Sequence, residues 1–163
     1  DLHPHRVALI SAQAERLGLP NVIAAQHDAT QPFEEFEGIA DCVLVDAPCT
    51  GLGTACHRPD VKWNKKQEDA AALAKLQRQI LQNASRSVKP GGKLIYCTCT
   101  FTQTENEDVV GWFLANNAAF HLTPLTLPKN MPGHSDEKSG MLRLWPQIHQ
   151  TDGFFICAME KIS

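Results

Sequence analysis

The chain has 163 residues, of which 43% are hydrophobic, and a formal net charge of −3. This length is enough for one compact domain with a core of its own, and the composition is that of an ordinary globular protein. No apolar run is long enough to cross a bilayer and no signal-peptide pattern opens the sequence, so we expect no membrane attachment. Several of the six cysteines lie inside apolar runs, which favours reduced thiols in a cytoplasmic setting over a disulfide framework.

The first part of the chain alternates between helical and extended patterns. Apolar residues spaced by three and four over residues 7–17 predict a helix that ends at Gly18. Residues 21–26 then form a short strand-like run. A polar connection over residues 29–40 leads to an apolar run at 41–45 that is typical of a buried strand. We therefore expect one helix followed by two strands.

A long amphipathic helix and a further strand come next. The apolar spacing predicts a helix from about residue 67 to 88, and the Lys-Pro-Gly-Gly sequence at 89–92 ends it. The apolar run at 93–97 is again typical of a buried strand. The Thr-Glu-Asn-Glu sequence at 104–107 has the form of a capping box, which would open a helix that continues through Leu114.

The order of these elements indicates an α/β fold. Strands alternating with helices predict a mostly parallel sheet covered on both faces. Right-handed crossovers would place the strands at 41–45 and 93–97 side by side. The runs at 141–145 and 154–159 are spaced as an antiparallel hairpin at the C-terminal end.

Each of the two buried strands is followed at once by a cysteine. The first carries the corner Asp46-Ala47-Pro48-Cys49, and the second carries the corner Thr98-Cys99-Thr100. Because ligands and catalytic groups gather beyond the carboxyl ends of parallel strands, neighbouring strands would bring Cys49 and Cys99 into one crevice. A thiolate is a strong nucleophile, and Asp46 could hydrogen-bond an amide-like edge or a cofactor amine. The corners therefore indicate covalent chemistry on an electrophilic carbon.

The cysteines also allow other interpretations. Cys97 and Cys99 form a C-x-C pair, but zinc sites more often use wider-spaced pairs, and no second pair of that kind is present. We therefore expect no metal site. Cys42, Cys97 and Cys157 lie within apolar runs, where a buried and inert thiol is the usual state, and we expect that state for these three.

The most basic stretch of the chain runs from His57 to Lys66. It contains four lysines and arginines against one aspartate, a local charge of +3. A short basic segment of this kind, with Arg58 and Lys62 beside Trp63, could grip RNA phosphates and stack on a base. The same composition also fits a solvated loop that leads into a helix.

Four motifs in order give a family resemblance. They are DAPCTG at residues 46–51, RPDVKW at 58–63, GGKLIYCTCT at 91–100 with ENE at 105–107, and TDGFF at 151–155. Together they resemble the Sun family of S-adenosylmethionine-dependent RNA cytosine-5 methyltransferases, and the match runs across nearly the whole chain. The resemblance implies a Rossmann-like class I methyltransferase fold, S-adenosylmethionine as cofactor, and an RNA substrate, ribosomal rather than transfer RNA.

The resemblance also implies roles for single residues. Cys99 matches the nucleophile that attacks carbon 6 of the target cytosine, which makes carbon 5 nucleophilic enough to take a methyl group. Cys49 matches the second cysteine, which assists release of the methylated product. Asp46 matches an acid that lies between the base and the cofactor. Asp1 matches the acid that binds the ribose hydroxyls of the cofactor, and Asp28 matches the residue at the edge of its adenine.

The family's first strand and glycine-rich cofactor loop would lie before Asp1. We therefore expect residues 1–163 to form a partial catalytic domain, truncated at its N-terminus, that binds S-adenosylmethionine weakly or not at all as an isolated piece. Sheet edges exposed in this way could support self-association. The alternative to an enzyme is a non-catalytic RNA-binding or scaffold fragment that retains the fold.

Overall fold

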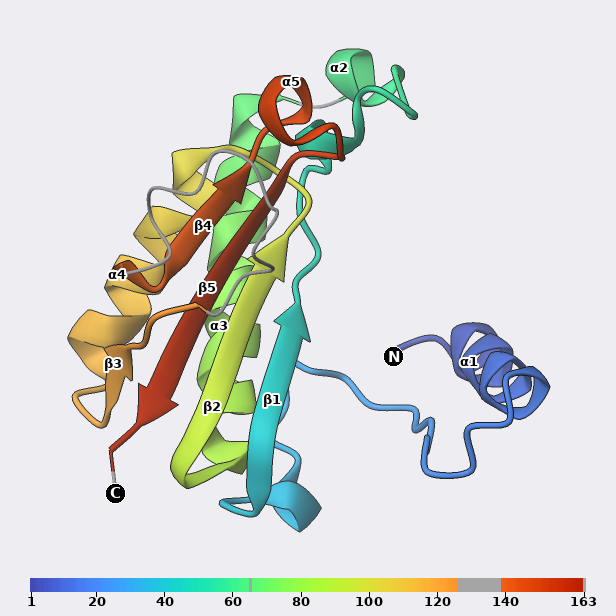
Figure 1. Cartoon of the computed structure of the whole chain (residues 1–163), viewed down its shortest axis with the longest axis vertical. Coiled ribbons are helices and arrows are strands. Elements are labelled where there is room, and N and C mark those ends of the chain that lie inside the picture. Colours follow the sequence, from blue (N-terminus) through green and yellow to red (C-terminus); the bar gives the residue numbers. More distant parts are fainter. Residues whose placement is uncertain (65, 126–138, 163) are drawn as a thin grey trace.

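A computed structural model describes residues 1–64, 66–125 and 139–162 of the chain (Figure 1). The α-helices and strands that these residues form are α1 (Pro4–Arg16), β1 (Ala40–Asp46), α2 (Val61–Asn64), α3 (Gln67–Ser87), β2 (Val88–Thr98), α4 (Glu107–Asn116), β3 (Phe120–Leu122), β4 (Met141–Leu144), α5 (Pro146–His149) and β5 (Phe154–Lys161).

The helices agree closely with the apolar spacing of the sequence. The two helices expected over residues 7–17 and 67–88 are confirmed as α1 and α3. Gly18 follows α1 with a left-handed φ of 66°, a conformation that glycine adopts without strain and that commonly ends helices. Within the described residues, no helix combines the length and the apolar character needed to span a bilayer.

The strands form one mixed sheet with the order β1-β2-β5-β3, and β4 also pairs with β5. β1 and β2 are parallel neighbours, with Asp46 opposite Cys97. β5 runs antiparallel to β2, to β3 and to β4, so β1 to β4 share one direction and β5 opposes them. Two predictions are thereby confirmed: the strands at 41–45 and 93–97 lie side by side, and the C-terminal strands pair as an antiparallel hairpin.

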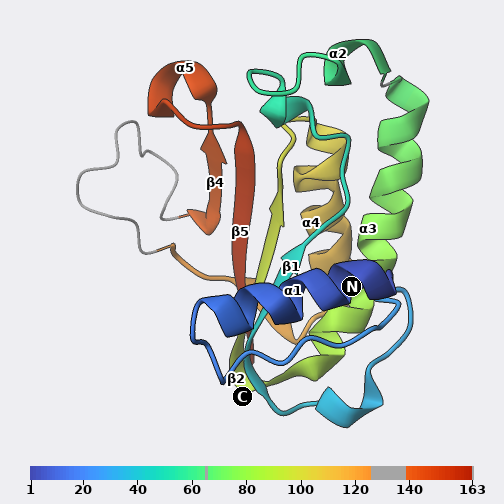
Figure 2. The same ribbon diagram turned by 90° about the vertical axis from the view of Figure 1, so that its right-hand side faces the viewer.

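The hydrophobic core lies between the sheet and two helices. α3 and α4 lie on the same face of the sheet in both views (Figures 1 and 2). Leu81 of α3 and Phe113 of α4 belong to one cluster with Leu94 and Tyr96 of β2, and all four side chains are completely buried. Alternate residues of a strand point to one face, so this core fixes which residues of β2 face the opposite side.

The opposite face of the sheet is open near β1, so the expectation of helices on both faces is wrong for the described residues. Leu44 of β1 is 66% exposed, and α1 lies beyond the β1 edge of the sheet (Figure 1). Cys42 points to the same side and is exposed. The prediction that Cys42 is a buried thiol is therefore also wrong, because β1 is an edge strand with one uncovered face.

The strand expected over residues 21–26 does not form. Residues 22–28 belong to no strand. The Asp1 amino group donates to the Ala25 carbonyl at 3.1 Å, and the His27 amide donates to the Asp1 carbonyl at 3.0 Å. A strand needs a ladder of such bonds along a neighbouring strand, and here a single residue lies alongside. An apolar run alone therefore predicted a strand that lacks its partner among the described residues.

Candidate active site

The ends of β1 and β2 bring the two cysteine corners together. The sulfur atoms of Cys49 and Cys99 are 3.2 Å apart. The Ala47 amide donates to the Cys97 carbonyl at 3.0 Å, which continues the parallel pairing into the first corner. Both thiols are free and half-buried. The prediction that the two cysteines share one site is confirmed in its geometry.

The two thiols differ in acidity because one donates a hydrogen bond to the other. The Cys49 thiol donates to the Cys99 sulfur, and this bond lowers the pKa of Cys99 to about 7. The same bond, together with burial, raises the pKa of Cys49. The thiolate form is therefore favoured at Cys99 and disfavoured at Cys49. Cys99 is therefore the more acidic of the two thiols.

The buried carboxylate of Glu105 connects the two corners through hydrogen bonds. Glu105 is completely buried, and its Oε1 accepts the Thr50 amide at 2.8 Å and the Gln77 side-chain amide at 3.2 Å. Its Oε2 accepts the hydroxyls of Thr50 at 2.6 Å and Thr102 at 2.7 Å. The Thr50 hydroxyl also bonds the Thr100 hydroxyl at 2.9 Å. Residues that follow Cys49 and Cys99 in sequence are thus joined to one acid.

Asn106 holds the second corner from the same side. Its Oδ1 accepts the Thr98 hydroxyl at 2.6 Å, and its amide donates to the Thr100 carbonyl at 3.0 Å. The capping box predicted at residues 104–107 does not form: α4 begins at Glu107, and no side chain caps it. The box would need the Glu107 side chain, but Glu107 pairs with Arg143, while the side chains of Glu105 and Asn106 bond the cysteine corners.

Asp46 lies at the mouth of β1 beside Cys97. The Cys97 sulfur is 3.8 Å from Asp46 Oδ1. Burial and the negative charge of Asp46 raise the pKa of Cys97 to about 11, so Cys97 stays a thiol although it is only half-buried. Cys157 is buried, and burial raises its pKa to about 12. The prediction of a buried thiol is thus confirmed for Cys157, while Cys97 is partly accessible.

Asp1 and Asp28 lie on adjoining segments, because Asp1 is bonded to Ala25 and His27. Asp1 Oδ1 accepts the His3 amide at 2.8 Å. Asp28 Oδ1 accepts the hydroxyl of Thr30 at 2.7 Å and its amide at 2.9 Å, and these bonds lower the pKa of Asp28. Two carboxylates thus lie on neighbouring stretches of the chain's first segment.

The basic segment is tied to the C-terminal TDGFF motif. His57 Nδ1 is 2.8 Å from Asp152 Oδ1. Gly53 donates to the Cys99 carbonyl and accepts the Gly153 amide, both at 2.9 Å. A Cβ atom on Gly53 would lie 2.0 Å from the Gly153 oxygen, so only glycine permits this approach. The turn at Gly53, just before the basic segment, is therefore joined to the loop that carries Cys99.

The three residues predicted to bind RNA lie together on the basic segment. Trp63 of α2 is 86% exposed. Arg58, in the loop before α2, is also exposed. The side chain of Lys62 lies outside the described part of the chain. An aromatic ring that exposed is unusual for a folded domain, because it forgoes the free energy of burial.

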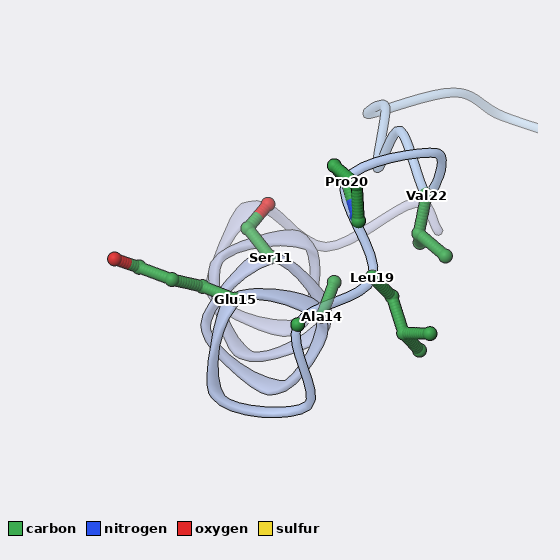
Figure 3. Close-up of a pocket in the computed structure, with 7 residues that line it drawn as sticks. Ser11, Ala14, Glu15, Leu19, Pro20 and Val22 are labelled. Carbon is green, nitrogen blue, oxygen red and sulfur yellow. The ribbon is translucent and has the colours of Figure 1, made fainter.

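Other features of the described residues do not add to this site. A hollow of about 410 Å³ lies between α1 and the turn that follows it (Figure 3). Its lining comes from residues 11–22 alone, so it contains neither corner.

No three histidine, cysteine or acidic side chains in the described part of the chain gather as metal ligands would.

Glu105 and Gln77 are site residues that sequence reasoning missed. Glu105 stood in a motif that also fitted a helix cap, and local spacing cannot tell these roles apart. Gln77 had a clearer signal, because it is a polar residue on the apolar stripe of α3. It is completely buried, and its amide also donates to the Pro48 carbonyl at 2.8 Å. A polar side chain on a buried helical face usually has a specific partner.

Comparison with known proteins agrees with this fold. The chain is 43% identical over 164 residues to a probable ribosomal RNA small subunit methyltransferase B of Bacillus subtilis, covering 99% of the chain and 36% of that protein. It is 36% identical over 176 residues to the human 28S rRNA (cytosine(4447)-C(5))-methyltransferase, covering 100% of the chain and 21% of that protein. The crystal structure of NSun6 from Pyrococcus horikoshii with SFG superposes with a TM-score of 0.82 at 32% identity, covering 100% of the chain and 40% of that structure.

The fold is thus that of the Rossmann-like methyltransferases. Residues 1–160 match the family model described as 16S rRNA methyltransferase RsmB/F, and the chain belongs to this family. The chain spans about a third of the length of the first curated relatives it matches.

Proposed function

We propose that the protein is an RNA cytosine-5 methyltransferase that acts on ribosomal RNA. The observation that carries this proposal is the pair of sulfur atoms 3.2 Å apart, of which Cys99 is the more acidic. A cytosine carbon 5 is a poor nucleophile until a bond forms at carbon 6, and covalent catalysis splits this difficult step into easier ones. The rRNA methyltransferases among the relatives support the choice of substrate.

In this mechanism Cys99 is the nucleophile. Its thiolate donates an electron pair to carbon 6 of the cytosine, and the ring's electrons shift toward carbon 5. S-adenosylmethionine, when bound, supplies the methyl group that carbon 5 takes up. A water molecule then takes the proton from carbon 5, the C–H electron pair returns to the ring, and the Cys99 sulfur leaves as a thiolate. Cys49, whose thiol already bonds the Cys99 sulfur, assists this release by stabilising the departing thiolate.

The residues proposed for the cofactor fit its chemistry. Ribose hydroxyls and an amino group are hydrogen-bond donors, and carboxylates accept from them. Asp1 and Asp28 lie on adjoining segments, with the pKa of Asp28 lowered by Thr30. Asp46 is exposed at the end of β1, where it can lie between a cofactor and a base. These three carboxylates would hold S-adenosylmethionine.

We propose that Arg58, Lys62 and Trp63 hold the RNA strand. Enzymes that modify a base must take it out of the stack to reach it, and an exposed aromatic ring can support the unstacked strand. Trp63 offers such a ring, and Gly53, in the turn before its segment, bonds the Cys99 carbonyl. The target cytosine would then reach Cys99 while a neighbouring base stacks on Trp63.

Self-association through the open sheet and a cytoplasmic location also remain proposals. The exposed edge strand β1, with Leu44 66% exposed, supports the first, because unpaired edges template further pairing. The six free thiols support a reducing compartment. Light scattering over a range of concentrations tests the first proposal, and a constant monomer mass would contradict it.

The catalytic proposal is tested by trapping. RNA that contains 5-azacytosine should form a covalent complex with the protein in its full natural length when S-adenosylmethionine is present. Mass spectrometry should place the adduct on Cys99, and Cys99→Ala should form none. Binding of the RNA without any adduct would favour a non-catalytic RNA-binding protein, and trapping by Cys99→Ala would refute the assignment of the nucleophile.

A further inference from the structure

Glu105 is an acid in an unusual place. Its side chain is completely buried, and a charge in the protein interior is strongly unfavourable unless hydrogen bonds replace its water shell. Four donors surround it, from Thr50, Gln77 and Thr102. Such a group is retained where its bonds hold parts of the chain in a required geometry, since an apolar side chain could fill the same space.

The bonds of Glu105 act on both sides of Cys49. On one side, the Thr50 amide and hydroxyl donate to the carboxylate. On the other, Gln77 donates from one amide nitrogen to Glu105 and to the Pro48 carbonyl. The two neighbours of Cys49 in sequence are therefore connected to one buried acid, which fixes the position of the Cys49 backbone.

The same acid reaches the Cys99 corner through one hydroxyl. The Thr50 hydroxyl donates to Glu105 Oε2, so its oxygen accepts the Thr100 hydroxyl at 2.9 Å. Thr100 directly follows Cys99. The backbone carbonyl of Glu105 accepts the Tyr96 hydroxyl at 2.7 Å, which anchors the acid to β2. A chain of three oxygen atoms thus spans the two corners behind the sulfur atoms.

We propose that Glu105 is a positioning residue that holds the Cys49 corner against the Cys99 corner, so that the two sulfur atoms stay in contact. This inference deepens the proposed function and rests on it for its catalytic meaning. Glu105 itself touches neither sulfur in this arrangement. Its effect on the reaction runs through Thr50, Gln77 and the two corners.

Positioning and simple electrostatics predict opposite results. The negative charge of Glu105 disfavours the Cys99 thiolate, whereas the bond from Cys49 favours it. If Glu105 acts by position, its loss separates the sulfurs and the pKa of Cys99 rises. If it acts only as a charge, its loss lowers that pKa. The sign of the change therefore identifies the role.

Two variants test the proposal in the protein of full natural length. Glu105→Gln keeps the shape of the side chain but replaces one carboxylate oxygen, which accepts hydrogen bonds, with an NH2 group. This group would face the hydroxyls of Thr50 and Thr102 as a donor. Thr50→Val keeps the carboxylate and removes the hydroxyl between Glu105 and Thr100, so the test stands even if the first variant does not fold. Glu107→Gln is the matched control, because Glu107 pairs with Arg143 and bonds neither corner.

The measurement is the pH midpoint of Cys99 alkylation by iodoacetamide, located by mass spectrometry. A second readout is the rate at which diamide closes a Cys49–Cys99 disulfide. In that step two thiols lose two protons and two electrons, and diamide is reduced to the hydrazine. Since a displacement of about 1 Å can slow a reaction up to about a hundredfold, closure should slow about ten- to a hundredfold.

The expected result is an upward shift of the midpoint and slower closure in Glu105→Gln and Thr50→Val, with Glu107→Gln unchanged. Where methyl transfer is measured, kcat should fall while KM for RNA stays constant. A midpoint that falls or stays constant in both variants would overturn the proposal. Neither thiol readout needs RNA or cofactor, so failure of the wild-type protein to methylate RNA would refute the proposed function without deciding this test.

Discussion

Removing the Cys49 thiol should make Cys99 less acidic. The bond from Cys49 is the largest influence that lowers the pKa of Cys99 to about 7, while burial and the charge of Asp46 raise it. Without this bond, Cys49→Ala should have a Cys99 pKa at or above the ordinary thiol value of 9.0. The alanine side chain fits the space left by cysteine, so the fold should be retained.

The size of the effect follows from the thiolate fraction. At pH 7 the ionised share of Cys99 should fall from about one half to about one per cent, a roughly fiftyfold loss. A more basic thiolate is also a better nucleophile, with a Brønsted slope of about 0.4–0.5, which offsets about six- to tenfold of that loss. Alkylation at pH 7 should therefore slow about five- to eightfold, whereas above about pH 10, where both thiols are ionised, Cys49→Ala should react about six- to tenfold faster.

The assay is iodoacetamide alkylation across pH 5 to 10, with fragment spectra that separate Cys99 from Cys97. Cys97→Ala is the matched control. It removes a neighbouring thiol that does not bond Cys99, so the Cys99 midpoint should stay near 7. Circular dichroism should show the same helix content in all three proteins. A Cys99 midpoint that stays near 7 in Cys49→Ala would refute the account of how this thiol is activated.

Three further predictions follow from other contacts. Asp46→Asn should lower the alkylation midpoint of Cys99, because the Asp46 charge raises that pKa; an upward shift would contradict this. Trp63→Ala should weaken RNA binding by about 1–3 kcal/mol, because a base loses its stacking partner. The salt dependence of binding should not change, because no contact to a phosphate is lost. Equal affinity of the two proteins in a filter-binding assay would exclude stacking on Trp63. Gly53→Ala places a Cβ atom 2.0 Å from a backbone oxygen and should reduce the free energy of unfolding by about 1–3 kcal/mol. In the control Gly111→Ala, the new Cβ atom meets nothing within 4 Å, so the protein should not be destabilised. Equal urea midpoints for both variants would refute the close-approach argument.

The contact between the cysteines could be predicted from sequence because it depends on one topological rule. Two apolar runs that each end in a cysteine corner become parallel neighbours, and parallel strands end at the same edge of the sheet. The register of Asp46 opposite Cys97 then places the following loops together. No long-range information beyond strand order was needed for that prediction.

The acid behind the corners could not be predicted in this way. Glu105 lies 55 residues from Thr50 along the chain, and it falls within the stretch at residues 104–107 that also suits a helix cap. The local sequence shows which hydrogen bonds a polar side chain could make to its nearby backbone. It does not show that Glu105 is buried and makes hydrogen bonds to distant parts of the chain instead. The strand expected at residues 21–26 failed for a related reason, because strand formation depends on a partner that an apolar run does not specify.

The most direct test of the central claim is the identity of the methylated nucleoside. The protein in its full natural length would be incubated with labelled S-adenosylmethionine and unmodified ribosomal RNA, and the digested RNA would be analysed by mass spectrometry. We expect label in 5-methylcytidine with the wild-type protein and none with Cys99→Ala. Label in any other nucleoside, or in 5-methylcytidine with Cys99→Ala, would contradict covalent catalysis by Cys99.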